Sequence, residues 1–299
     1  MDEEIYEKYI LAGKIASEAR NMGSKIIKPG VSLLDVANKV EAEILKSGAG
    51  IAFPVNLSIN EIAAHYSPNH ADKLIFKKGD VVKLDVGAHV DGYIADTAVT
   101  VEVETDKHSD LIKASEEGLK VAIDMIKPGV SLSSIGSSVS KKIAEYGFKP
   151  VDNLTGHSLE KFVLHSGVSV PSIPDLMNKH KVKEGEVLAI EPFATDGTGH
   201  VVSGSGSNIF RCSSSFKSKF VRDRRSKLLH NRLVKSFKTL PFAERWTTSL
   251  FENNETILRR LSFLGMLKHY PQLIDVGKGI VTQKEHTVII TKDGCEVTT

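Results

Sequence analysis

Two aspartates flank a two-residue turn in the stretch VKLDVGAHVDGYIADTAVTVEV, residues 82–103. Asp91-Gly92 is a dipeptide favoured in two-residue hairpin loops because both positions tolerate positive φ. With that loop, Asp85 and Asp96 become diagonal neighbours on one face, about 7 to 8 Å apart at the backbone. The aliphatic neighbours predict a half-buried site, where two unpaired carboxylates resist ionisation unless a cation lies between them. A solvated hairpin with two exposed aspartates is the alternative interpretation.

Two further carboxylates stand beside apolar strands. Glu191 ends the run GEVLAIE, and Glu285 precedes HTVIIT. Four carboxylates balance two divalent cations, and an oxygen-rich set with little imidazole suits Mn, Fe, Co or Zn better than a thiolate-bound structural zinc. Two such ions, about 3.5 to 4 Å apart, lower the pKa of a bridging water and polarise a substrate carbonyl. The chemistry that these residues predict is therefore hydrolysis.

The chain repeats itself, which predicts how these residues are positioned. IKPGVSL at residues 27–33 recurs without change at residues 126–132, an offset of 99. The helical apolar patterns that follow keep this offset in three matching pairs: Val36 and Ile135, Val40 and Val139, Ile44 and Ile143. A seven-residue identity before two helices of the same phase indicates two copies of one α/β half.

The repeat extends to the candidate site. GDVVKLD, which ends at Asp85, is answered by GEVLAIE, which ends at Glu191. In the same way His165 answers His65. Two halves related by a pseudo-twofold axis would bring both carboxylates and both histidines to a shared cleft.

Composition indicates an ordinary globular chain. It has 299 residues, of which 41% are hydrophobic and 25% charged, and a net charge of +2, so it has no overall bias toward nucleic acid or membrane. No run reaches the roughly 18 apolar residues of a membrane span, and the acidic N-terminal segment does not resemble a signal peptide. Cys212 and Cys295, far apart and in no metal-like spacing, favour a reducing compartment. We therefore expect a cytoplasmic protein.

The segment after AIEPFA breaks the repeat. Between residues 211 and 238, ten Lys and Arg residues stand against the single Asp223, and apolar residues at helical spacing follow. We expect an inserted helical subdomain at residues 207–270 and a catalytic domain formed by residues 1–206 and 271–299. The basic stretch could neutralise phosphates of ribosomal RNA, and the alternative is a solvated helical face with a basic loop.

Five stretches in order resemble one known family: AFPVNLSINEIAAHYSP, KLDVGAHVDGYIADTA, NLTGHSLEKFVLHSG, AIEPFA and YPQLIDVGKGIVTQKEHT. That family is the type 2 methionine aminopeptidases of the archaeal-like kind, and the similarity covers nearly the whole chain. It implies an α+β fold of the pita-bread (creatinase/aminopeptidase) type, with two pseudo-symmetric α/β halves around a curved antiparallel sheet. It also implies that the helical insert is the one that separates type 2 from type 1.

The resemblance implies a dinuclear metal centre with two divalent ions, which would be Co, Mn, Fe or Zn. In it, Asp85 binds one ion, while His157 and Glu191 bind the other. Asp96 and Glu285 bridge both ions. All five positions hold the residue types that the family pattern expects.

The resemblance also implies roles in turnover. Glu191 is the expected proton shuttle for the bridging water. His65 and His165 are expected to contact the scissile amide and to stabilise the tetrahedral intermediate as hydrogen-bond donors. The methionine side chain is expected in a pocket of five residues: Phe53, Leu164, Phe193, Tyr270 and Leu273.

The implied activity is removal of the N-terminal methionine from peptides and nascent proteins with a small second residue. We expect a monomer with transient ribosome contacts and with no specific DNA or membrane partner. One alternative is a pita-bread peptidase of another specificity, such as a proline dipeptidase, although those usually carry an N-terminal domain of their own. A second alternative is a non-catalytic relative that binds ribosomal RNA or a protein. Such a relative should have lost metal ligands, and this chain has kept all five.

Overall fold

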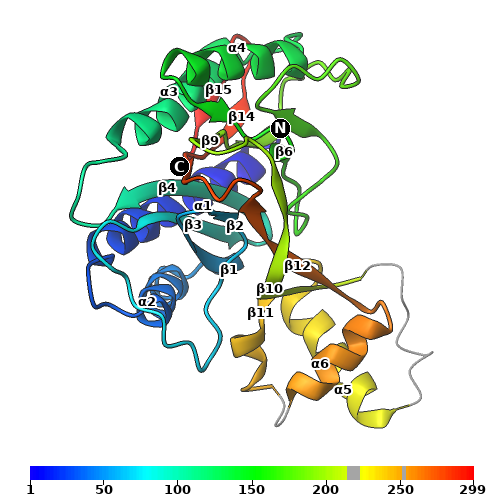
Figure 1. Cartoon of the computed structure of the whole chain (residues 1–299). Coiled ribbons are helices and arrows are strands. Elements are labelled where there is room, and N and C mark those ends of the chain that lie inside the picture. The colour runs from blue at the N-terminus through cyan, green and yellow to red at the C-terminus, as the bar shows by residue number, and fades with distance from the viewer. Residues whose placement is uncertain (214–222, 251–253) are drawn as a thin grey trace.

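The computed structural model describes residues 1–213, 223–250 and 254–299. Figure 1 shows a first α/β half in blue to cyan, a second half in green and red, and a helical part in yellow to orange at one end. Each half has its own cluster of buried aliphatic side chains. Among the helices that the structure describes, none is long and apolar enough to cross a membrane.

The first half is a three-stranded antiparallel sheet covered by two helices. The helices are α1 (Glu3–Ile26) and α2 (Leu33–Lys46), and the sheet contains, in this order, β1 (Gly50–Ile59), β3 (Val81–Val90) and β4 (Tyr93–Glu102). Asp2 caps α1 by accepting a hydrogen bond from the Glu4 amide at 2.9 Å. The helix α1 packs closely on β3 and β4 because its buried face carries small residues: Ala12, Ala16, Ala19 and Gly23.

The second half repeats this plan with shorter strands. Its helices are α3 (Ser109–Met125) and α4 (Leu132–Glu145). Its main sheet has the order β15-β14-β8-β6-β7 and is made of β6 (Thr155–Ser158), β7 (Ser169–Pro171), β8 (Val187–Ile190), β14 (His286–Ile290) and β15 (Cys295–Val297). A smaller sheet of order β13-β9-β5 contains β5 (Lys149–Pro150), β9 (Phe193–Thr195) and β13 (Val281–Gln283).

The predicted repeat is confirmed in the backbone. The helices α2 and α4 both have 14 residues, and their first residues, Leu33 and Leu132, keep the offset of 99. Before each helix, a glycine with positive φ donates its amide to a matching carbonyl: Gly30 to Phe76 at 2.9 Å and Gly129 to Val182 at 2.8 Å. The two halves are therefore copies of one supersecondary unit.

The hairpin of β3 and β4 has the predicted register and joins the two halves. Its turn residues Asp91 and Gly92 have φ values of 52° and 92°, and Asp85 lies opposite Ala98. On the other edge of β4, the Glu285 amide donates to the Ala98 carbonyl at 3.2 Å and the Ala98 amide donates to the Glu285 carbonyl at 3.4 Å. The strand β4 therefore lies at the centre of the molecule, between β3 and the start of β14.

In the sequence, the helical part connects two long strands that pair with each other, β10 (Val201–Cys212) and β12 (Leu267–Asp275). The short strands β11 (Phe242–Ala243) and β2 (Ile62–Ala64) complete their sheet in the order β11-β10-β12-β2. Between the long strands are α5 (Arg224–Phe237), the 3-10 helix η2 (Glu244–Thr247) and α6 (Asn254–Phe263). They share an apolar core around Leu229, Leu233, Leu258 and Leu261.

The predicted limits of the inserted subdomain, 206/207 and 270/271, fall within β10 and β12. The division of the chain into residues 207–270 and a catalytic domain therefore stays a prediction. Part of the predicted basic stretch, residues 214–222, lies outside the described residues.

Candidate metal centre and substrate pocket

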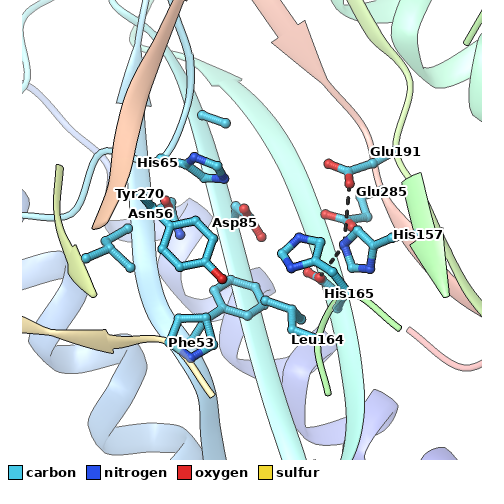
Figure 2. Close-up of a pocket in the computed structure, with 14 residues that line it drawn as sticks. Phe53, Asn56, His65, Asp85, His157, Leu164, His165, Glu191, Tyr270 and Glu285 are labelled. Carbon is cyan, nitrogen blue, oxygen red and sulfur yellow. Dashed lines mark ion pairs between the residues drawn. The ribbon is translucent and has the colours of Figure 1, made fainter. Parts of the chain in front are cut away.

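A pocket lies where β1, β3 and β4 meet the second half and the strands β10 and β12. Figure 2 shows Glu191, Glu285 and His157 on one side of it and Phe53 and Tyr270 on the other. Its lining residues include all five predicted metal ligands and both predicted catalytic histidines. The full set is Phe53, Asn56, Ala64, His65, Asp85, Asp96, His157, Leu164, His165, Glu191, Ile209, Pro241, Tyr270 and Glu285.

The five candidate ligands come from five different strands or strand ends. Asp85 lies on β3, Asp96 on β4 and His157 on β6, while Glu191 follows β8 and Glu285 precedes β14. The Nε2 atom of His157 is 3.5 Å from Glu191 Oε1 and 3.6 Å from Asp96 Oδ2. Ligand atoms of Asp96, His157 and Glu285 all lie within 4.8 Å of one another. One cation with bonds of about 2 Å can span up to about 4 Å between two ligand atoms, which includes the distances of 3.5 and 3.6 Å from His157.

Backbone pairing brings one carboxylate from each half to the same residue. Ala98 of β4 has Asp85 opposite it on one side and Glu285 opposite it on the other. The hydroxyl of Thr97 donates to the Glu285 carbonyl at 3.0 Å and also accepts from Arg20 of α1. The position of Glu285 therefore depends on contacts with the first half.

The second half positions its donors through the pairing of β6 with β8. His157 lies opposite Ala189, and Glu191, two residues further on, points to the same face because side chains alternate along a strand. Gln283 Nε2 donates to Glu191 Oε2 at 3.1 Å and to Glu285 Oε2 at 3.4 Å. Gln283, which the sequence did not single out, thus orients two of the four carboxylates.

Burial makes the charged forms of these groups unfavourable. It raises the pKa of Asp85 to about 7 and the pKa of Asp96 well above its usual range. It raises the pKa values of Glu191 and Glu285 in the same way, and neighbouring carboxylates add to the increase. Burial also lowers the pKa of His157 well below its usual value. A divalent cation fits this set because it pairs with carboxylates and binds neutral imidazole.

Unpaired buried atoms support the same conclusion. Within the described residues, four buried atoms of the candidate ligands have no hydrogen-bond partner: Asp85 Oδ1, Asp96 Oδ1, His157 Nδ1 and Glu285 Oε1. Buried polar atoms are normally paired, because leaving one unpaired costs about 1 to 3 kcal/mol. Carboxylate oxygens with one imidazole suit Mn, Fe, Co or Zn. The residues present therefore fit a metal centre.

Two histidines lie beside the candidate ligands. The rings of His165 and His157 have centroids 4.3 Å apart, and His65 meets the Tyr270 ring edge-on at 5.3 Å. Burial lowers the pKa values of His65 and His165 to about 4, so both rings are neutral near pH 7. His65 Nδ1 lies 3.2 Å from the Pro271 carbonyl. Since a carbonyl only accepts hydrogen bonds, neutral His65 offers Nε2 as an acceptor.

The predicted methionine pocket is assembled in part. Phe53, Leu164 and Tyr270 line the cavity (Figure 2). Phe193 and Leu273 are not among its lining residues in the described structure. Phe193 is buried in an apolar cluster that also contains the lining residue Ala64, and Leu273 packs against that cluster. Contact of these two residues with a methionine side chain stays a prediction.

Four lining residues were not singled out from the sequence: Asn56, Ala64, Ile209 and Pro241. Asn56 lies opposite Asp85, so the register of β1 on β3 would have identified it. Ile209 and Pro241 belong to β10 and to the chain just before β11. No local pattern marks them, because only the return of the helical part toward the first half brings them to the pocket.

Comparison with known proteins agrees with this site. The model of metallopeptidase family M24 matches residues 7–233. A methionine aminopeptidase of Methanocaldococcus jannaschii is 45% identical over 299 residues, which cover 100% of both chains. Among solved structures, a thermophilic Arx1 matches with a TM-score of 0.87 at 18% identity. The match covers 100% of this chain and 91% of that one. The methionine aminopeptidase of Thermotoga maritima has a TM-score of 0.73 at 24% identity, with coverage of 100% of this chain and 98% of that one.

The chain therefore belongs to metallopeptidase family M24, and it has the pita-bread fold of that family. Such peptidases depend on metal ions, which agrees with the buried cluster of Asp96, His157 and Glu285. Within the family, full-length similarity to archaeal methionine aminopeptidases gives the activity, which is removal of the N-terminal methionine from peptide substrates. This similarity favours methionine aminopeptidase over the two alternative interpretations, a proline dipeptidase and a non-catalytic relative.

Proposed function

We propose that the protein hydrolyses Met–Xaa bonds with a small second residue by means of two divalent ions. The supporting observation is the convergence of four carboxylates and one imidazole on a single pocket, with several of their buried atoms unpaired among the described residues. Asp85 would hold one ion, His157 and Glu191 the other, and Asp96 and Glu285 both. Bound there, ions of this kind lower the pKa of a water molecule and polarise the peptide carbonyl.

We assign proton transfer to Glu191. Its Oε2 atom accepts a hydrogen bond from Gln283 at 3.1 Å, which fixes the orientation of the carboxylate. Its Oε1 atom faces the candidate metal centre, 3.5 Å from His157 Nε2. In this assignment Glu191 takes a proton from the attacking water and passes it to the leaving amine.

We assign the two histidines to the scissile amide. Because His65 Nδ1 faces the Pro271 carbonyl, neutral His65 can accept the peptide N–H at Nε2. The donor role that the family resemblance implies for His65 requires its other tautomer or a protonated ring. His165 is then the candidate donor to the oxygen that gains negative charge in the tetrahedral intermediate.

We assign the methionine side chain to the apolar side of the pocket. Phe53, Leu164 and Tyr270 from the predicted set line it, together with Ile209. A thioether chain needs an apolar and adaptable surface of this kind. The preference for a small second residue is carried over from the family resemblance.

A cleavage series on one sample tests this function. Metal is removed with a chelator and restored with Co²⁺ or Mn²⁺, and release of Met from Met-Ala-Ser is compared with release from Met-Leu-Ser. We expect no cleavage without metal, recovery on addition of metal, and a preference of at least about 10-fold for the alanine peptide. Full activity of the chelated protein, or equal cleavage of both peptides, would contradict the proposal.

We also propose that this monomeric enzyme acts on nascent chains and contacts ribosomal RNA transiently through its basic stretch. In the described part of that stretch, α5 exposes Arg224, Lys227 and Lys235. Contacts of this kind with phosphates weaken as salt rises. Reversing the charges of Arg224, Arg225 and Lys227 to Glu should reduce co-sedimentation with ribosomes at low salt and leave turnover of Met-Ala-Ser unchanged. Unchanged co-sedimentation would remove this part of the proposal.

A further inference from the structure

Strand β1 carries two pocket residues on either side of a bulge. Phe53 and Asn56 are three residues apart on β1, but their partners on β3 are only two apart. Between them, the backbone of Val55 bonds to side chains. The Val55 amide donates to Glu41 Oε1 at 3.1 Å, and Ser67 Oγ donates to the Val55 carbonyl at 3.0 Å. The path of β1 through the pocket therefore depends on Glu41 and Ser67.

One arginine of the helical part holds both of these side chains. Arg245 of η2 donates from Nη1 to Ser67 Oγ at 2.8 Å and to the Pro68 carbonyl at 2.9 Å, and its Nη2 pairs with Glu41 Oε1. The neighbouring Trp246 donates from Nε1 to Glu41 Oε2 at 2.9 Å. The helical part is thus joined to the β1 bulge by one network of hydrogen bonds.

The central side chains of this network are buried. Glu41 is 5% exposed, Arg245 8% and Ser67 0%. Burial raises the pKa of Glu41, and the guanidinium of Arg245 opposes that change. Removing one partner of such a pair leaves a buried charge without compensation, so the geometry of the network is strongly constrained.

The network also lies next to a pocket histidine. Ser67 is two residues after His65, and the Leu57 amide of β1 donates to the Tyr66 carbonyl at 2.8 Å. The segment that carries His65 is therefore tied to β1 on one side and to Arg245 on the other. A displacement of Ser67 would move His65 and the β1 bulge together.

We propose that Arg245 is a positioning residue for the substrate pocket. It fixes Phe53 and Asn56 through the bulge at Val55, and it fixes His65 through Ser67 and Pro68. This inference rests on the proposed use of the pocket for the methionine side chain and the scissile amide. By this proposal, the helical part affects the shape of the pocket between the two halves through Arg245, which does not itself line the pocket.

The variant Arg245→Lys tests the proposal. Lysine keeps a positive charge near Glu41, but its compact ammonium group cannot reproduce the planar fork that serves Glu41, Ser67 and Pro68 at once. We expect kcat/KM for Met-Ala-Ser to fall by about 10-fold or more, because small displacements of positioning groups have effects of this size. The ratio of kcat/KM for Met-Ala-Ser to that for Leu-Ala-Ser should also fall, and bound metal should not change.

Asp223→Ala is the matched control in the same helical part. Asp223 caps α5 by accepting from the Ser226 amide at 2.9 Å, so its loss lowers the stability of that region without touching β1. We expect its kcat/KM for Met-Ala-Ser to stay within about 2-fold of the unmodified protein. We expect the same of its Met-to-Leu ratio, which is kcat/KM for Met-Ala-Ser divided by kcat/KM for Leu-Ala-Ser. Trp246 is the single tryptophan of the chain, so its fluorescence reports whether each variant keeps this contact folded.

If Arg245→Lys and Asp223→Ala lose similar thermal stability and both keep kcat/KM and the Met-to-Leu ratio, Arg245 only stabilises the fold and the proposal is overturned. If Arg245→Lys does not fold, Ser67→Ala replaces it, with the same changes expected at about 3-fold and the same overturning result. Failure of the proposed function is distinguishable, because it would appear as absent Met release by the unmodified, metal-loaded protein.

Discussion

The two halves of the molecule form the same strand pair by different routes. In the first half, β3 and β4 are joined by a two-residue turn, residues 91–92. In the second half, the corresponding strands β8 and β14 also pair antiparallel, but residues 191–285 separate them and include the helical part. Each pair supplies two carboxylates to the pocket: Asp85 and Asp96 from the first, Glu191 and Glu285 from the second.

This difference separates local from long-range control of the site. The relative position of the two aspartates follows from one short turn and the alternation of side chains along its strands. The position of Glu285 follows from the pairing of its backbone with Ala98 in the other half. A large segment can thus be inserted into one copy of the hairpin while the strand pair is kept, because tertiary contacts replace the turn.

The largest effect should come from removing, in either half, the carboxylate that we propose as a bridge between the two ions. Asp96→Asn in the first half and Glu285→Gln in the second should each lower kcat/KM by at least about 1000-fold, equivalent to about 4 kcal/mol of transition-state stabilisation. Cleavage of Met-Ala-Ser and bound metal are measured on the same preparations. Retained metal and turnover in one of the two variants would show that its half does not contribute a bridge.

Removal of either of the two histidines that correspond in the repeat, His65 and His165, should have the next largest effect. His65→Ala and His165→Ala should each lower kcat by about 100- to 10,000-fold, because we assign both side chains to the scissile amide. Neither should change the metal content, which is measured by atomic emission. If His65→Ala lost its metals, the role assigned to His65 would be wrong and this histidine would belong to the metal centre.

A smaller effect should appear in the pH dependence of the metal-free protein. The folded protein holds the pKa of Asp85 at about 7, above the value of 3.8 expected for the unfolded chain, and burial raises the pKa values of Asp96 and Glu285 in the same direction. Below about pH 7 the buried histidines act in the opposite direction, because burial lowers their pKa values and the unfolded chain then binds more protons at these sites. Above about pH 7 histidines are neutral in both states, so the raised carboxylates let the folded state bind more protons and the free energy of unfolding falls as pH rises.

Thermal melts in a chelator across this pH range measure the effect, and metal-loaded protein is the control. We expect the Tm of the chelated protein to fall by several degrees between pH 7 and pH 9, and we expect a weaker dependence with metal bound. A Tm that rises with pH over this range in the chelator would contradict the convergence of carboxylates from the two halves.

The smallest effect should come from the turns themselves. Gly92 has a φ of 92°, and a Cβ there would lie 2.4 Å from a ring atom of Phe162. Gly92→Ala should therefore lower the free energy of unfolding by about 1 to 3 kcal/mol. Gly294, in the sequence Asp293-Gly294, has no positive φ, and no described heavy atom lies within 4 Å of a Cβ built there.

The variant Gly294→Ala is thus the matched control, with a change within about 0.5 kcal/mol. Urea denaturation of both variants measures the difference. Equal stability of the two variants would mean that the 91–92 turn does not set the register of β3 on β4.

The predictable part of the fold is the part that local sequence controls. The hairpin register, the facing of Asp85 and Asp96 and the repeat of α2 in α4 follow from a turn dipeptide and a seven-residue identity. Periodicity and charge also predicted helices in the inserted segment, although its limits are hidden within the continuous strands β10 and β12. Strand pairing that continues across a boundary leaves no mark in composition.

The less predictable part of the site depends on contacts between distant segments. His157 was expected only from family resemblance, since no local pattern marks it as a ligand, and Glu285 was marked only by its place before an apolar strand. Asn56 and Pro241, which line the pocket, and Gln283, which donates to Glu191, were not expected at all, because each is positioned by the pairing or packing of another element. Phe193 is buried in an apolar cluster, and its contact with a methionine side chain stays a prediction.

Metal stoichiometry is the most direct test of the central claim that the two halves enclose a pair of divalent ions. Metal-free protein is titrated with Mn²⁺ in a calorimeter, and Met release is followed on the same titrated samples. We predict two equivalents bound per chain, with turnover appearing as the sites fill and with fewer equivalents bound by Asp85→Asn. Full turnover by a protein that binds no metal, or unchanged stoichiometry in Asp85→Asn, would contradict the account.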